Sequence, residues 1–175
     1  MSLQPDYILK AVFSDQKFDL LIAEVKKPQA KITQLVGDEA KLANLLKIML
    51  NRLILQRIPS PVVCGIINDG TFTKTFKMTI KSSGKYDFVQ LACFQSIRCI
   101  DDLARLPNVM NYMNQMKNIV LYMQEVIRMT MLGESLLDPL PLSLAPLEWL
   151  RPSFEYSVAE PTAKKAKVAF SLFAV

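Results

Sequence analysis

The sequence "FDLLIAEVKKP", residues 18–28, predicts a strand around which the rest of the fold can be arranged. Residues 18–26 form an apolar run of strand length whose end carries Glu24 and Lys26. Side chains two residues apart on a strand point to the same face, so Glu24 and Lys26 share one face while Val25 points to the other. Pro28 cannot donate to a sheet ladder and prevents this strand from continuing as a paired central strand. The two charged side chains are either polar residues at a solvated strand end or part of a site.

The preceding run "YILKAVF", residues 7–13, is the expected partner of this strand. The polar stretch at residues 14–17 joins the two runs and predicts a hairpin, and we expect both strands near the centre of a sheet. The best apolar face pairs Tyr7, Leu9, Ala11 and Phe13 with Glu24, Ile22, Leu20 and Phe18. This register puts Asp6 opposite Val25, so Asp6 and Glu24 can share a face only after a one-residue shift or a bulge in the ladder.

The middle of the chain predicts a helix followed by a meander. Gly37 and Asp38 open the helix, with Asp38 as N-cap, and the helix stops before the prolines of "IPSP", residues 58–61. Its apolar face is expected to be Leu42, Leu45, Leu46, Met49, Leu50 and Leu53. Strand-like runs at residues 62–68, 71–80 and 85–94, separated by Asp69-Gly70 and Gly84, predict a three-stranded meander with one packed face and one partly wet face.

A second long helix follows, with Pro107 in its first turn and its end near Gly133. Its expected apolar stripe is Val109, Met113, Met116, Val120, Met123 and Ile127. The methionines of this helix favour core packing over the alternative of an adaptable partner-binding groove. The prolines of residues 134–175 predict an extended C-terminal arm that packs partly through Leu147, Trp149 and Phe154.

Composition limits the chemistry that the chain can perform. The chain has 175 residues, no His and a formal net charge of +5. Without His, Ser-His and Cys-His nucleophiles are excluded, and Cys64, Cys93 and Cys99 are too few for a tetrahedral zinc site. We expect the three cysteines to be free thiols in the core. Any metal ion would be bound by oxygen ligands. The positive charge is compatible with a polyanionic partner but is too diffuse to require one.

Targeting signals are weak. No apolar run reaches the roughly 18 to 20 residues that cross a bilayer, and residues 1–7 lack the features of a secretory signal, so we expect an intracellular protein with no membrane partner. The basic cluster "PTAKKAKV", residues 161–168, is a weak match to a nuclear import signal; a solvated tail is the favoured alternative.

The order of elements predicts an α/β fold with a helix on each face of the sheet, and sites in such folds gather at strand ends. Pro5-Asp6 stands at the start of the first strand and Glu24-Val25-Lys26 at the end of the second. This pattern resembles the PD-(D/E)xK nuclease superfamily, whose hallmark is Pro-Asp on one strand and Asp or Glu, any residue, then Lys on the next. The resemblance implies a restriction-endonuclease-like mixed β-sheet over residues 1–133, with the family's first helix missing or lost.

By this resemblance, Asp6 and Glu24 are ligands of Mg²⁺ or Mn²⁺, and Lys26 assists the attack of water on a phosphodiester of DNA or RNA. The alternative for Asp6 is that it is an acidic residue at the start of a strand with no role in a site. Lys41, in the first turn of the expected helix, is a further candidate for this site, against the alternative of a solvated lysine. The implied function is Mg²⁺-dependent hydrolysis of nucleic acid.

Two other classes of function stay open. One is a catalytically inactive member of the same fold that binds nucleic acid or protein. The other is an interaction module that works through the Met-rich helix or the Pro-rich arm. The sequence leaves the oligomeric state undetermined.

The meander and the second helix carry a further resemblance. "FKMTIKSSGKYDFVQL", residues 76–91, and "LPNVMNYMNQMKNIV", residues 106–120, are similar to segments of uncharacterised proteins predicted from early-diverging fungi. This resemblance implies no activity, but it indicates a natural domain.

Overall fold

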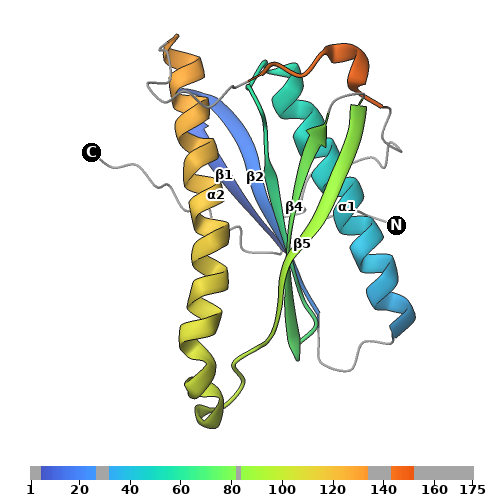
Figure 1. The fold of residues 1–175 in the computed structure, drawn as a ribbon, viewed down its shortest axis with the longest axis vertical. Helices are drawn as coiled ribbons and strands as arrows, with labels where there is room; N and C mark the ends of the chain where they lie inside the picture. Colours follow the sequence, from blue (N-terminus) through green and yellow to red (C-terminus); the bar gives the residue numbers. More distant parts are fainter. Residues whose placement is uncertain (1–4, 27–31, 82–83, 134–142, 152–175) are drawn as a thin grey trace.

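The protein is built around a mixed five-stranded sheet with a long helix on each face (Figure 1). The computed structural model describes residues 5–26, 32–81, 84–133 and 143–151. Along the chain the elements are β1 (Tyr7–Phe13), β2 (Gln16–Val25), α1 (Ile32–Leu55), β3 (Val63–Asn68), β4 (Phe72–Lys81), β5 (Lys85–Gln95), the 3-10 helix η2 (Ile100–Arg105), α2 (Leu106–Leu132) and the 3-10 helix η3 (Leu147–Trp149). The α/β class, the hairpin and the meander are as predicted.

The strands stand in chain order across the sheet. Only β2 and β3 are parallel, because α1 carries the chain back between them; the other neighbours are antiparallel. The hairpin was expected near the centre of the sheet, and for β1 this is wrong. β1 is an edge strand, with Tyr7 and Val12 about half exposed. Its apolar composition comes from one covered face and does not require a neighbour on both sides.

The predicted apolar face of α1 is confirmed, since all of its Leu and Met side chains from Leu42 to Leu53 are buried. The predicted start is wrong. The helix begins at Ile32, so Gly37 and Asp38 lie inside it and Asp38 is not an N-cap. A glycine inside a helix costs about 1 kcal/mol relative to alanine, which the packing of a long apolar face offsets.

Gly65 lets α1 approach the sheet closely. A Cβ atom at Gly65 would lie 2.9 Å from both terminal methyl carbons of Leu42 and 3.0 Å from one of Leu46. The face of the sheet that carries Gly65 is therefore the face that α1 covers.

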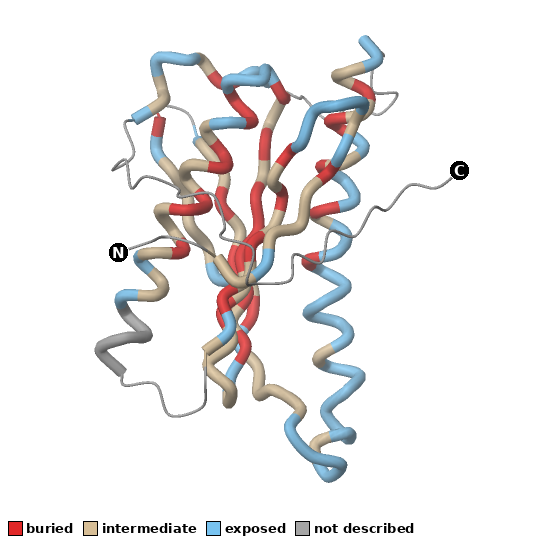
Figure 2. The backbone as a smooth tube through the Cα atoms, turned by 180° about the vertical axis from the view of Figure 1, so that it is seen from behind, coloured by how far each residue is buried: buried red, intermediate tan, exposed pale blue. Residues whose placement is uncertain are grey.

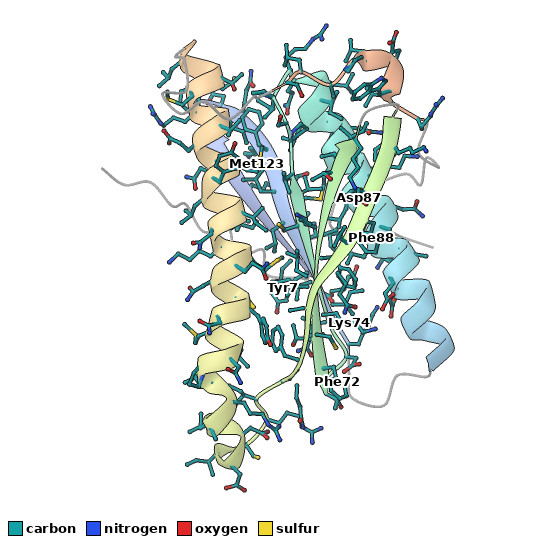
Figure 3. The ribbon with its side chains drawn as sticks, in the orientation of Figure 1. Tyr7, Phe72, Lys74, Asp87, Phe88 and Met123 are labelled. Carbon is teal, nitrogen blue, oxygen red and sulfur yellow. The ribbon has the colours of Figure 1, made fainter. Side chains whose placement is uncertain are left out.

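α2 has a proline in its first turn and ends at Gly133, whose φ of 68° is left-handed and whose N–H donates to the carbonyls of Met129 and Thr130. The predicted stripe is buried only from Met116 onward; Val109 is partly exposed and Met113 is 37% exposed. Figure 2 shows the N-terminal turns of α2 as exposed or partly exposed, with buried segments only further along the helix, and Met123, in the buried part, points toward the sheet (Figure 3). The 27-residue helix is about 40 Å long. In its first ten residues Tyr112 stacks on Phe94 of β5, with the ring centroids 5.1 Å apart, but none of these ten residues is buried.

Three smaller expectations meet a mixed outcome. The wet face predicted for the meander is wrong at Thr73 and Thr75, which are 8% and 0% exposed, because both faces of the sheet are covered. Of the three free thiols, Cys64 is in the core as predicted, whereas Cys93 and Cys99 are exposed. No helix in the described ranges has both the length and the apolarity of a bilayer span.

The described part of the C-terminal arm packs against the sheet and α1. The N–H of Ser143 donates to Ser60 Oγ over 3.1 Å, and the N–H of Arg151 donates to Tyr86 Oη over 3.3 Å. Trp149 packs on the core as predicted, but Leu147 is 41% exposed. Phe154 and the basic cluster at residues 161–168 lie outside the described residues.

Candidate functional site

The register between β1 and β2 decides where Asp6 lies. Leu9 pairs with Leu21 but Lys10 pairs with Asp19, so Leu20 is an extra residue and β2 has a bulge there. Beyond the bulge Tyr7 pairs with Ala23. The predicted pairing of Tyr7 with Glu24 is therefore wrong by one residue, and continuing the observed ladder by one position puts Asp6 across from Glu24.

Asp6 and Glu24 lie on the face of the sheet that α1 covers. Directly opposed residues of an antiparallel pair share a face, and Ile8 is opposed to the buried Ile22. In the parallel ladder Ile22 is in register with Gly65, which faces α1. Asp6 and Glu24, two residues from Ile8 and Ile22, project to this same side. The shift that a shared site requires is present.

Glu24 is a buried carboxylate that two lysines neutralise. Its residue is 2% exposed. Lys41 Nζ donates to Oε1 over 2.7 Å, and Lys26 Nζ lies 3.7 Å from Oε2. A buried ion is tolerated when it is paired and hydrogen-bonded, so these lysines are what permits an acid at this position. The sequence alternative of a solvated strand end does not describe Glu24, and Lys41 reaches the site from α1.

Lys26 is held between two strands and a helix. Its backbone N–H donates to the carbonyl of Asn68 over 2.7 Å, which ties it to the end of β3. Its ammonium lies 3.1 Å from Asp38 Oδ1 as well as near Glu24. Burial pulls the pKa of Lys26 down, but the hydrogen bond to Asp38 and the charges of Glu24, Asp38 and Asp6 outweigh it and leave the pKa raised. Lys26 is therefore a cation at neutral pH.

Asp6 is fixed by the backbone of β2. The N–H of Val25 donates to Asp6 Oδ2 over 2.8 Å. Val25 lies between Glu24 and Lys26 in the sequence, so this bond holds the Asp6 carboxylate at the end of β2 that carries both residues. We call Asp6, Glu24, Lys26, Asp38 and Lys41 the Glu24 cluster. It carries three carboxylates against two ammonium groups, and this excess of negative charge favours a cation.

A second ion pair lies in the same row of the sheet. Glu24 is in register with Ile67 of β3, and Ile67 with Lys74 of β4. Lys74 Nζ donates to Glu39 Oε1 of α1 over 2.6 Å, a bond that is the main cause of the raised pKa of Lys74. Figure 3 labels Lys74 near the α1 side of the sheet.

The sequence reasoning missed this pair and the role of Asp38. One signal was available in each case. Lys74 interrupts the alternating apolar positions Phe72, Phe76 and Met78, where a lysine needs a charged partner. The sequence predicts Asp38 as a cap because the preceding glycine, Gly37, is typical of a helix boundary.

Among the described residues, two carboxylates fit the small set of protein ligands that Mg²⁺ requires. Mg²⁺ is commonly bound through one or two carboxylates, with water and substrate phosphate as the remaining ligands, and Asp6 and Glu24 supply two carboxylates from neighbouring strands. In the described ranges, no group of three or more Asp, Glu or Cys side chains is arranged to hold a metal ion. Lys41 occupies Oε1 of Glu24, so a metal on that oxygen requires this ammonium to move.

No family model, no curated protein and no solved structure matches the chain. The function therefore has to be argued from the site itself.

Proposed function

We propose that the chain is a Mg²⁺-dependent phosphodiesterase of nucleic acid whose active site is the Glu24 cluster. The observation that carries this proposal is the bulge at Leu20, which brings the start of β1 into register with the end of β2, so that Asp6, Glu24 and Lys26 meet at one corner of the sheet. The mixed sheet with a helix on each face supports assigning the restriction-endonuclease-like fold to residues 1–133.

The roles follow from the environment of each group. Asp6 and Glu24 would hold the metal, which when bound supplies an acidified water and charge stabilisation at the phosphate. Lys26, whose pKa is raised, stays protonated at neutral pH and so acts as a positive charge beside the phosphate and not as a base. Asp38 fixes the position of the Lys26 ammonium.

The test is cleavage of plasmid DNA and of single-stranded RNA by the purified chain with Mg²⁺, with Mn²⁺ and with EDTA. Glu24→Gln and Lys26→Met are each expected to lower the cleavage rate about 100-fold or more, since each removes charge at the reacting centre. Glu125→Gln is the matched control, because it removes a carboxylate of the exposed Arg128 pair on α2. Circular dichroism checks that each variant is folded. Equal rates for wild type and Glu24→Gln contradict the proposal.

The second candidate is a binding module of the same fold that does not hydrolyse its ligand. It is favoured by the two ammonium groups that already neutralise Glu24, because a carboxylate paired with two lysines is not free to hold the metal that hydrolysis requires. Gel mobility of DNA with EDTA distinguishes the two candidates. A salt-sensitive shift that needs no metal, with no cleavage in Mg²⁺ or Mn²⁺, supports this second function; a shift that appears only with metal counts against it.

A further inference from the structure

A second set of charges surrounds a cavity at the other end of β2 and α1. The cavity has a volume of about 290 Å³, and its lining includes Lys10, Lys17, Asp19 and Arg52 together with Met49 and Leu53. We call it the Arg52 pocket. Asp19 is five residues from Glu24 along β2, about 16 Å for an extended strand, so the pocket is separate from the Glu24 cluster.

The bulge at Leu20 also builds this pocket. Lys10 is the register partner of Asp19, and Lys10 is two residues from Ile8, on the α1 side of the sheet. Because Leu20 is the extra residue, Asp19 turns to that side as well, and its Oδ2 lies 3.3 Å from Arg52 Nη1 of α1. Asp19 therefore holds a cation from a strand and a cation from a helix at the same cavity.

The pocket has more positive than negative charge. Lys10, Lys17 and Arg52 face a single carboxylate, that of Asp19, which leaves two positive charges uncompensated among the charged residues of the lining. Lys17 makes no ion pair with any residue that the structure describes. Lys10 Nζ lies 2.8 Å from Asp19 Oδ1 and its side chain is 36% exposed. An ammonium group has three N–H donors, so those that do not face Asp19 remain available to a ligand.

The C-terminal end of α1 lies beside the Arg52 pocket but does not repel an anion bound there. A helix C-terminus usually presents unpaired carbonyl oxygens with partial negative charge. In α1 the carbonyls of Arg52, Leu53 and Ile54 accept hydrogen bonds from the backbone N–H groups of residues 56–58. The left-handed Arg57, with φ 60°, makes this closure possible.

One wall of the pocket is apolar. Leu55, which is 60% exposed, supplies its accessible surface, and Met49 and Leu53, which are buried in the core, lie behind it. A ligand that matches both parts has an anionic head for the three cations and an apolar body for this wall. A phosphate monoester carries close to two negative charges at neutral pH, which equals the uncompensated charge of the pocket.

We propose that the Arg52 pocket binds a small phosphate monoester with an apolar body. Lys10, Lys17 and Arg52 bind the phosphate, and Leu55 contacts the body. This site is independent of the function proposed for the Glu24 cluster, because the two sites share no residue.

The test is NMR titration of the ¹⁵N-labelled full chain at constant ionic strength with three probes: phenyl phosphate, inorganic phosphate and phenol. Phenyl phosphate is expected to cause saturable shifts at the amides of Lys10, Lys17, Asp19 and Arg52. Inorganic phosphate is expected to bind the same amides more weakly, and phenol more weakly still, because each probe lacks one part of the match. Absence of saturable shifts at about 10 mM phenyl phosphate, where a millimolar site is largely filled, overturns the proposal.

Variants test which charges bind. Arg52→Gln is expected to weaken phenyl phosphate binding about tenfold, the effect of one lost charge-assisted hydrogen bond, and Lys17→Gln about fivefold. Lys117→Gln removes the same charge from an exposed position on α2 and is expected to leave binding unchanged. Equal loss in all three variants means diffuse attraction and overturns the site. Tighter binding of a DNA oligonucleotide than of phenyl phosphate at these amides also overturns it, in favour of a nucleic-acid surface.

Discussion

Replacing Lys41 by methionine should destabilise the fold, because Glu24 would lose its closest partner. Glu24 is 2% exposed, and Lys41 Nζ lies 2.7 Å from its Oε1. Methionine keeps most of the apolar stem of lysine, so the substitution removes mainly the charge and the hydrogen bond. Lys26 remains, but at 3.7 Å from the other oxygen.

The size of the effect follows from these distances. At an effective dielectric constant of about 20, the attraction at 2.7 Å is about 6 kcal/mol. Desolvation of the two ions and screening of an ammonium group that is 21% exposed offset most of it. A hydrogen bond to a charged partner is worth about 1.5 to 3 kcal/mol net, so we expect Lys41→Met to lower the free energy of unfolding by about 2 kcal/mol.

A double-mutant cycle makes this expectation sharp. Once Lys41 is absent, Glu24→Gln removes a buried charge that lacks its main partner, so Lys41→Met/Glu24→Gln should be about 1 kcal/mol more stable than Lys41→Met alone. Urea unfolding followed by circular dichroism at pH 7 measures the free energy of unfolding of the four proteins of the cycle: wild type, Lys41→Met, Glu24→Gln and the double mutant. Lys117→Met is the control on an exposed face and should change stability by less than about 0.5 kcal/mol. If the losses of unfolding free energy in the two single mutants simply add in the double mutant, the interaction between Lys41 and Glu24 is refuted.

Three further results are expected. Gly65→Ala should lower the free energy of unfolding by about 2 kcal/mol, because its Cβ would lie 2.9 Å from Leu42, and urea unfolding measures this loss. Gly37→Ala should raise the free energy of unfolding by about 1 kcal/mol in the same assay, since Gly37 is in α1 with open space around a Cβ; a loss would contradict the helical assignment. Burial raises the pKa of the Cys64 thiol to about 12, so a thiol reagent at pH 8 should modify Cys93 and Cys99 in the native protein and Cys64 only after unfolding.

The apolar face of α1 and the strands of the hairpin and the meander were predictable because they depend on local periodicity. Leu42, Leu46 and Leu50 repeat at helical spacing, and a helix that packs on a sheet must bury them wherever it begins. The start of α1 depends on a balance of about 1 kcal/mol at Gly37, which tertiary packing decides. The exposure of residues 106–115 of α2 was not predictable, because the apolar stripe continues through them and burial depends on what the helix packs against, not on its own periodicity.

The candidate site was predictable in its residues and not in its geometry. Glu24 and Lys26 follow from their place at the end of an apolar run, but their relation to Asp6 depends on register. Residues 20–23 of β2 are all apolar, so their hydrophobic pattern does not distinguish a regular ladder from one with an extra residue. Asp19 was the available signal, because a charged residue inside such a run has to reach a cation.

Both sites depend on this one irregularity. In a regular ladder that keeps the hairpin turn at Ser14 and Asp15, β2 would continue the register of Lys10 with Asp19, and Asp6 would then pair with Ala23 and not with Glu24. Asp19 and Glu24 are five residues apart and would point to opposite faces of a regular strand, yet both reach α1, at Arg52 and at Lys41. The extra residue at Leu20 is what brings both carboxylates to one helix. A bulge inside a buried strand leaves one residue out of the ladder, and bulges recur beside active sites because they redirect side chains, as this one does for Asp19 and Glu24.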